Sequence, residues 1–316
     1  MDLKYGIPVV DFSDFISGDL EKKYDFIQKL GNAYEEIGFV AVKNHGVSSN
    51  IIKSMYQQMA SFFSLPEEIK KKYEISPDGK VGYTSFGREH AKGSEAGDLK
   101  EFWHFGQFPY SGEQENLNLA SNVMVKEVPE FLTTGQAMYR AMEGVGIQIL
   151  RAISLFLNLD EFFFDEWVHG GISILRPIHY PPIIDDPKGS VRAGAHEDIN
   201  LITLLVGASA EGLEVLNKKG EWVPVTAIED FLVVNVGDML QRLTNNKLRS
   251  TTHRVVNPPK EKWNESRYSV PFFLHPKPEM SLACLPQCID SEHPKLYEDV
   301  TSGEYLDERL KEIGLK

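Results

Sequence analysis

Short apolar runs separated by turn residues fill the second half of this chain, and this pattern restricts the fold more than any other feature. From Gly171 onward eight candidate strands follow one another with no long helix between them. Strands of this length and spacing are typical of a sandwich or barrel. We therefore expect a mainly β fold with flanking helices around a double-stranded β-helix, the jelly-roll or cupin-like core that holds a small ligand between its sheets. The expected strands are 172–180, 192–196, 201–206, 213–216, 222–225, 232–236, 250–256 and 268–274.

The first half of the chain mixes helices with short strands. Apolar residues at helical spacing run through 20–37 and again through 129–159, where Gly144 and Gly146 interrupt the pattern. Because glycine lowers helix propensity, we expect a sheet to approach the helix closely at these glycines. We expect residues 1–170 to form a helical and mixed region that buttresses the barrel, 171–285 the jelly-roll core and 286–316 a C-terminal helical tail, all in one integrated domain.

The charge of the chain excludes several classes of partner. The formal net charge is -13 at pH 7. Nucleic acids and anionic membranes bind clustered Lys and Arg, so neither is expected as a partner. The basic run from Lys70 to Lys72 follows an acidic turn, and we expect it at the solvated end of a helix.

Cysteine content and hydropathy indicate the compartment. Cys284 and Cys288 are too few for a disulfide framework, and no further Cys or His pair completes a zinc site with them. The first residues, Met1 to Pro8, contain no apolar h-region of the kind expected of a leader, and no apolar run is long enough to span a bilayer. We therefore expect a cytoplasmic protein that is not embedded in a membrane.

A candidate metal site comes from two of the expected strands. His196-Glu197-Asp198 ends one strand, and the two-residue period puts His196 and Asp198 on the same face. A further ligand, His253, stands in the middle of another expected strand. Two neutral nitrogens and a carboxylate on one face of an octahedron bind iron(II) and leave three positions open for substrate and dioxygen. We call His196, Asp198 and His253 the triad, and predict that it holds the metal and carries the catalytic chemistry.

Each part of the triad also has an ordinary structural interpretation. A His-x-Asp pair alone is more often a surface turn, and a lone His253 is more often a hydrogen-bonded core histidine. A second motif favours the metal-binding interpretation over the structural one. Arg267 and Ser269 share one face of a later strand. A guanidinium binds a carboxylate through two N–H groups, and a neighbouring hydroxyl adds a third hydrogen bond. A metal triad beside a carboxylate clamp describes a site for a keto acid that chelates the metal.

These residues belong to an ordered set of motifs that spans nearly the whole chain. The chain resembles the isopenicillin N synthase-like family of iron(II)- and 2-oxoglutarate-dependent dioxygenases. The motifs that carry the resemblance are Ile7-Pro8-Val9-Val10-Asp11-Phe12, Gly38-Phe39, Asn44-His45-Gly46-Val47, Phe62-Phe63-Ser64-Leu65-Pro66, Gly82-Tyr83, Asp98-Leu99-Lys100-Glu101, Tyr180-Pro181, His196-Glu197-Asp198, Gly212-Leu213-Glu214-Val215, Asn235-Val236-Gly237-Asp238, His253-Arg254-Val255 and Arg267-Tyr268-Ser269-Val270-Pro271-Phe272-Phe273.

The resemblance implies a role for each part of the site. The triad is expected to bind iron(II), and Arg267, Ser269 and Tyr180 are expected to surround the distal carboxylate of 2-oxoglutarate. Dioxygen is the other cosubstrate, and ascorbate is a candidate reductant. The implied reaction oxidises a C–H bond and releases succinate and carbon dioxide, by hydroxylation in most relatives and by desaturation or ring formation in some. His45 matches a structural turn of the family and is not counted as a ligand.

Three departures from the family pattern are visible. The interval between His253 and Arg267 is longer than usual, so we expect an extended loop between their strands. Ile178 stands where many plant members carry Asn, which removes one polar neighbour of the cosubstrate. Pro177 lies inside an expected strand and indicates an edge or a bulge there.

The substrate side of the site has two interpretations. The two-residue period places Arg176 and Phe273 on the barrel-facing side, next to the metal. In the family the position of Phe273 lies beside the substrate, and the positions of Phe102 and His104 lie near the mouth. A cation with aromatic faces favours a small substrate that is anionic and partly apolar. Alternatively, Phe102 and Phe273 are plain core and Arg176 reaches solvent at a rim.

Three rival functions stay open at this point. An oxidase of the isopenicillin N synthase type needs no 2-oxoglutarate, and its arginine and serine hold the substrate instead. Zinc in the triad with a bound water would make a hydrolase, although a hydrolase has no need of the Arg267 clamp. A non-catalytic jelly-roll binding protein would be expected to lack a metal ligand or the clamp, and neither is missing.

Overall fold

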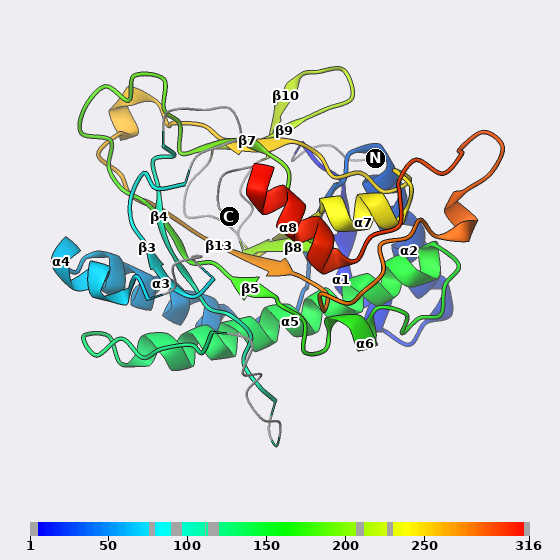
Figure 1. Cartoon of the computed structure of the whole chain (residues 1–316), viewed down its shortest axis with the longest axis horizontal. Coiled ribbons are helices and arrows are strands. Elements are labelled where there is room, and N and C mark those ends of the chain that lie inside the picture. The colour runs from blue at the N-terminus through cyan, green and yellow to red at the C-terminus, as the bar shows by residue number, and fades with distance from the viewer. Residues whose placement is uncertain are drawn as a thin grey trace.

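Two β-sheets lie face to face at the centre of the protein, with the helices arranged around them (Figure 1). The structure is a computed structural model and describes residues 6–75, 80–89, 97–110, 112, 120–206, 212–225 and 230–312. The strand order is β1-β2-β11-β8-β13-β6-β4-β3 in the larger sheet, where β5 also pairs with β13, and β10-β9-β12-β7 in the smaller sheet. A small apolar cluster that includes Phe39, Val215 and Val233 fills part of the space between the sheets. This arrangement confirms the expected jelly roll with flanking helices.

The strand bounds agree closely with the sequence pattern. The larger sheet contains β1 (Val9–Asp11), β2 (Phe39–Lys43), β3 (Gly82–Thr84), β4 (Glu101–His104), β5 (Ile174–Leu175), β6 (Ile178–Tyr180), β8 (Ile202–Val206), β11 (Leu232–Val236) and β13 (Arg267–Leu274). The smaller sheet contains β7 (Ala193–His196), β9 (Leu213–Leu216), β10 (Trp222–Pro224) and β12 (His253–Val255).

Two expected strands differ from the observed ones. The run 172–180 is divided into β5 and β6, with Arg176 and Pro177 between them, because proline has no N–H to donate to a strand ladder. The expected strand 250–256 begins only at His253, which is therefore the first residue of β12 and not its middle. The loop after β12 contains a short 3-10 helix, η2 (Lys260–Lys262).

The N-terminal region contributes strands to the larger sheet. Strand β2 is antiparallel to β11, β1 is parallel to β2, and β4 is antiparallel to β6. Residues before and after position 170 therefore share one hydrogen-bonded sheet. We propose on this ground that the chain forms one integrated domain in which the first 170 residues complete the barrel.

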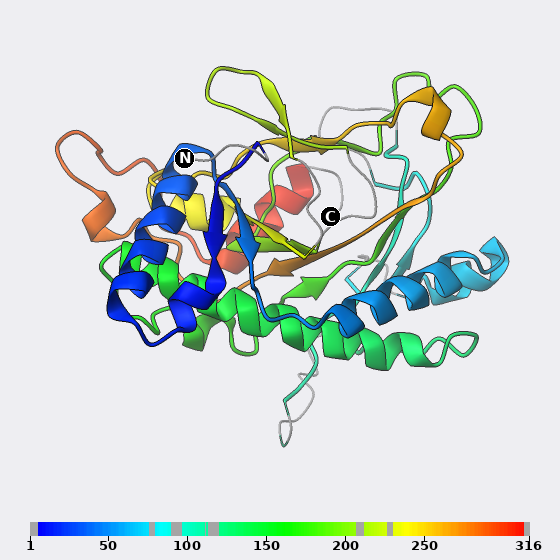
Figure 2. The same ribbon diagram turned by 180° about the vertical axis from the view of Figure 1, so that it is seen from behind.

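Helices cover the outer face of the larger sheet and the ends of the barrel (Figure 2). The long helix α5 contacts β5, β8 and β13, and α2 and α3 pack beside it. Residues 289–301 are not helical, so only part of the expected C-terminal tail is helix. Among the described residues, no helix is long and apolar enough to cross a membrane. The helices are α1 (Phe12–Ile16), α2 (Leu20–Glu36), α3 (Ser49–Phe63), α4 (Glu67–Lys70), η1 (Lys71–Tyr73), α5 (Glu130–Phe156), α6 (Asp165–Val168), α7 (Asp238–Leu243), η3 (Pro286–Cys288) and α8 (Ser302–Glu312).

The glycines of α5 show how closely the sheet approaches this helix. A Cβ atom on Gly146 would lie 3.2 Å from Leu274 Cδ2 and 3.3 Å from Leu204 Cδ1, both on sheet strands. The expected close approach is therefore observed at Gly146. The same expectation is wrong for Gly144, where a Cβ would meet nothing within 4 Å.

The basic run at the end of α4 is not uniformly solvated. Lys71 and Lys72 are exposed, as expected, but Lys70 is buried and its ammonium lies 2.6 Å from the buried carboxylate of Glu101. The other oxygen of Glu101 lies 2.7 Å from His179 Nδ1. The expectation for Lys70 is wrong because β4 brings an acidic partner to the end of α4, and a paired charge can be buried.

Two glycines of α5 allow a matched test of this packing. A Cβ on Gly135 would lie 2.5 Å from the ring of Phe105, which is fully buried. We expect Gly135→Ala to destabilise the protein by about 1 to 3 kcal/mol through overpacking. Gly144→Ala is the control, because the exposed position has room for a methyl group, and the gain in helix propensity should stabilise by about 1 kcal/mol. Urea unfolding of both variants measures the two changes, and equal effects would contradict the packing argument.

Candidate active site

A cavity between the two sheets brings most of the expected site residues together. The open space between its walls is about 620 Å³, a volume that includes solvent at its mouth. Its lining residues include the complete triad, the clamp residues Arg267 and Ser269, and Tyr180. The smaller sheet supplies the histidines and the larger sheet supplies the clamp.

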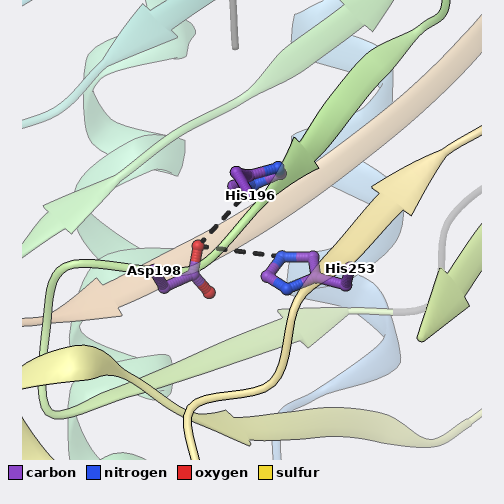
Figure 3. A group of neighbouring side chains, drawn as sticks. All are labelled: His196, Asp198 and His253. Carbon is purple, nitrogen blue, oxygen red and sulfur yellow. Dashed lines mark ion pairs between the residues drawn. The ribbon is translucent and has the colours of Figure 1, made fainter. Parts of the chain in front are cut away.

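The triad converges on one point, as Figure 3 shows. Asp198 Oδ1 lies 3.9 Å from His196 Nε2 and 3.8 Å from His253 Nε2. Register pairing of β12 with β7 places the two histidines directly opposite each other. The three donor atoms all lie within 4.8 Å of one another, a spacing that one metal ion can bridge.

Backbone carbonyls orient both imidazole rings. His196 Nδ1 lies 2.7 Å from Gly194 O, and His253 Nδ1 lies 3.1 Å from Thr251 O. A ring that donates its Nδ1–H to a carbonyl keeps its Nε2 lone pair for a ligand. Desolvation by the cavity walls and the neighbouring His253 lower the pKa of His196 to about 4, so this ring is neutral at pH 7.

The two oxygens of the Asp198 carboxylate make different contacts. Its Oδ2 atom accepts hydrogen bonds from Thr203 Oγ1 at 2.6 Å and Asn235 Nδ2 at 2.8 Å. Burial would raise the pKa of Asp198, but the two histidines and these hydrogen bonds outweigh it and lower the pKa. Its Oδ1 atom faces the histidines. Two imidazole nitrogens and one carboxylate oxygen are the donor set that suits iron(II), so the residues present fit that ion.

The clamp lies on the opposite sheet and is almost fully buried. Arg267 is 1% exposed and Ser269 is 2% exposed. Arg267 stands opposite Tyr180 in the β13–β6 register, and its guanidinium carbon lies 4.7 Å from the centre of the tyrosine ring. Ser269 stands opposite Ile178, so this aliphatic side chain also lines the cavity. The clamp residues and Tyr180 therefore form one wall of the cavity.

A second buried arginine lies behind that wall. Arg192 is 2% exposed, and its guanidinium carbon lies 5.9 Å from the centre of the Tyr180 ring. Its Nη2 donates to Glu265 O at 3.0 Å. Burial and the positive charge of Arg267 lower the pKa of Arg192 to about 10, so it is still charged at neutral pH.

The expected substrate residues are only partly in the cavity. Arg176 and Phe273 line it, whereas Phe102 and His104 are buried outside the lining at 4% and 5% exposure. The guanidinium carbon of Arg176 lies 4.5 Å from the Phe102 ring centre and 5.0 Å from that of Phe273. His104 Nε2 accepts from Arg176 Nε. Phe102 and His104 thus support Arg176 from behind and do not lie at the mouth.

Several polar residues of the site carried no role in the sequence interpretation. No sequence motif singled out Thr203, because only the fold shows that its hydroxyl lies next to Asp198. Lys100 and Asn235 stand within motifs of the family resemblance, yet nothing in those motifs shows that both side chains line the cavity. Glu89 lies next to Arg176 and Lys100 in space and far from Arg176 in the chain. His45 makes a local turn, where its Nδ1 accepts from Val47 N at 3.1 Å.

Comparison with known families finds two models that match this chain. The family described as "2OG-Fe(II) oxygenase superfamily" matches residues 171–276, and "non-haem dioxygenase in morphine synthesis N-terminal" matches residues 7–127. The chain is 31% identical to the 2-oxoglutarate-Fe(II) type oxidoreductase hxnY of Emericella nidulans, over 94% of this chain and 89% of that protein.

Two solved structures are similar over nearly their whole length. One is a Caulobacter crescentus protein assigned to the 2OG-Fe(II) oxygenase family, with a TM-score of 0.88, 42% identity and coverage of 98% of this chain and 99% of that chain. The other is a full-length Neurospora crassa protein in complex with alpha-KG and thymine, with a TM-score of 0.85, 31% identity and coverage of 96% of each chain.

The geometry of the triad predicts that metal binding stabilises the folded protein. A ligand at about 100 times its Kd adds about 2.7 kcal/mol, so anaerobic iron(II) should raise the Tm. His253→Ala removes one of three protein donors, and its Tm should respond much less to iron(II). His293→Ala is the matched control, because the His293 side chain is 68% exposed. A full Tm response in His253→Ala would remove that residue from the proposed ligand set.

Proposed function

This chain belongs to the 2OG-Fe(II) oxygenase superfamily, and we propose that it hydroxylates a C–H bond of a small, partly apolar metabolite in the cavity between its two sheets. Iron(II) and 2-oxoglutarate are its cofactor and cosubstrate, as in its relatives. The expectation of a 2-oxoglutarate-dependent enzyme is thereby confirmed over the independent oxidase, the zinc hydrolase and the non-catalytic binding protein. The observation that carries our proposal is that the triad and the carboxylate clamp line the same cavity.

We propose that His196 Nε2, His253 Nε2 and Asp198 Oδ1 are the iron ligands. The donor spacing, the neutral state of His196 and the hydrogen bonds that orient each ligand all support this assignment. Bound iron(II) with 2-oxoglutarate supplies the oxidising chemistry, in which dioxygen is consumed and succinate and carbon dioxide are released.

The remaining groups place the two organic reactants. Arg267 and Ser269 are suited to the distal carboxylate of 2-oxoglutarate, because their donors are preorganised and nearly excluded from water. Tyr180 closes this end of the cavity. Apolar side chains, among them Leu205 and Val233, line the space beside the triad. They exclude water from the reacting centre and favour an apolar substrate surface.

The substrate end of the cavity is defined by Arg176 and Phe273. A guanidinium held against two aromatic rings is fixed in position and offers N–H donors to a bound molecule. The Neurospora crassa complex with alpha-KG and thymine supports a small ring compound as the kind of molecule such a cavity accepts. We therefore propose a small metabolite with an apolar body and one polar group that Arg176 recognises.

Replacement of Arg267 tests the cosubstrate assignment. We expect Arg267→Ala to raise the 2-oxoglutarate concentration needed for half-maximal succinate formation, because losing one partner of a buried charge pair costs roughly 3 to 5 kcal/mol. Arg254→Ala is the matched control, since Arg254 pairs with Glu214 and its side chain is 33% exposed. A 2-oxoglutarate requirement that stays at the wild-type value in Arg267→Ala would refute the clamp.

Replacement of Arg176 tests the substrate assignment. Arg176→Met keeps most of the side-chain volume and deletes the charge. It should reduce succinate formation that depends on a substrate found by screening, while the slow decay of 2-oxoglutarate without substrate continues. Both rates are measured in the same assay by succinate release. An equal loss of both rates would assign Arg176 to the cosubstrate end or to the fold.

A further inference from the structure

Lys100 is a buried lysine in the wall of the active-site cavity to which the proposed function assigns no role. It stands two residues after Asp98, and its side chain is only 8% exposed. Its Nζ lies 2.8 Å from Glu89 Oε2 and 2.8 Å from Asp98 Oδ2. It lines the same cavity as His196 and Tyr180. A lysine in this position can reach a molecule bound beside the triad.

The two carboxylates fix the ammonium without using all of its donors. Asp98 is itself held, because its Oδ1 accepts from Gly194 N at 3.0 Å. An ammonium has three N–H groups, and within the described part of the chain Asp98 and Glu89 are its two acceptors. Among the residues that the structure describes, one N–H of Lys100 is therefore left for a ligand. The geometry of Lys100 is that of a positioned hydrogen-bond donor.

The charges around Lys100 balance one another. Arg176 Nη1 lies 3.4 Å from Glu89 Oε2, so Glu89 is shared by the two cations Lys100 and Arg176, while Asp98 pairs with Lys100. Burial would raise the pKa of Glu89, but the charges of Lys100 and Arg176 lower it strongly, so Glu89 is ionised. His104, which contacts Arg176, and Tyr180 are further titratable groups that face this cluster among the described residues. We call the four charged residues Lys100, Arg176, Glu89 and Asp98 the charge quartet.

The charges around the triad are also matched. Iron(II) and Arg267 would carry three positive charges, and Asp198 with dianionic 2-oxoglutarate three negative charges, while the further cation Arg192 lies behind the Tyr180 wall. Beside Arg176 and Lys100, a substrate carboxylate would therefore meet no uncompensated cation. Such a charge is costly to bury unless it is paired. A neutral oxygen acceptor needs only a hydrogen-bond donor.

We propose that Lys100 is a substrate-binding residue that donates a hydrogen bond to a neutral carbonyl oxygen of the substrate, and that the charge quartet excludes carboxylates from this end of the cavity. This inference rests on the proposed function and narrows its substrate class, since it replaces the anionic substrate suggested by Arg176 alone. It applies to amides, lactams and other neutral carbonyl compounds with an apolar body.

Benzamide and benzoate are a matched pair of probes that differ in charge at one polar group. Their binding to the full-length protein, loaded anaerobically with iron(II) and saturating 2-oxoglutarate, is measured by calorimetric titration. Saturating 2-oxoglutarate keeps benzoate from the Arg267 clamp. We expect wild type to bind benzamide at least about tenfold more tightly than benzoate, which is the scale of one hydrogen bond to a charged group.

Variants distinguish the effect of the Lys100 hydrogen bond from the effect of the net charge of the quartet. Lys100→Met combined with Glu89→Gln removes one cation and one anion. The double variant should therefore bind benzamide about tenfold more weakly than wild type, and its affinity for benzoate should stay low. Glu89→Gln alone gives the quartet a net positive charge, and benzoate should then bind about tenfold more tightly. Lys43→Met is the control, because Lys43 forms an exposed ion pair with Asp11, and neither affinity should change.

Each other result overturns the inference. It fails if benzoate binds wild type as tightly as benzamide, if the double variant keeps the benzamide affinity, or if benzamide shows no saturable binding up to its solubility limit. Succinate formation without any probe is measured for the same proteins. If wild type forms no succinate, the proposed function itself is contradicted. If wild type forms succinate but the probes do not bind as expected, only the role of Lys100 is contradicted.

Discussion

The carboxylate of Asp198 connects the two sheets, and the geometry of the site depends on it. Asp198 follows β7 of the smaller sheet, yet its Oδ2 atom accepts from Thr203 on β8 and Asn235 on β11, both in the larger sheet. Its Oδ1 atom is thereby turned toward the histidines. Burying a carboxylate costs free energy unless its oxygens accept hydrogen bonds or bind a cation. The triad therefore forms only when the two sheets are packed in their correct relative position.

Local periodicity explains why much of the site could be predicted from the sequence. Alternation along β13 places Arg267 and Ser269 on one face, and the same rule places His196 near Asp198. The division of 172–180 at Pro177 also follows from a local rule. The pairing of Lys70 with Glu101 and of Lys100 with Glu89 could not be predicted. Each of these pairs depends on which strand or loop lies opposite, and a single sequence does not specify that.

The first 170 residues complete the site as well as supporting it. Phe39 on β2 and Lys100 just before β4 both line the cavity, and Phe102 on β4 packs against Arg176 from behind. The larger sheet could not enclose the substrate end without β4, which pairs with β6 at Phe102 and Ile178. This sharing of one cavity supports our proposal of one integrated domain, because neither region would bury its part of the wall alone.

The cavity is electrically asymmetric, and this asymmetry orients its two reactants. Arg267 lies near a second buried cation, Arg192, at the Tyr180 wall, and the repulsion between them contributes to the lowered pKa of Arg192. A local excess of positive charge favours a dianion at that end. On the side of Arg176, Glu89 and Asp98 offset the charges of Lys100 and Arg176. A dicarboxylate therefore gains most beside Arg267 and Arg192, and the charge-balanced side is left for a molecule that brings no charge of its own.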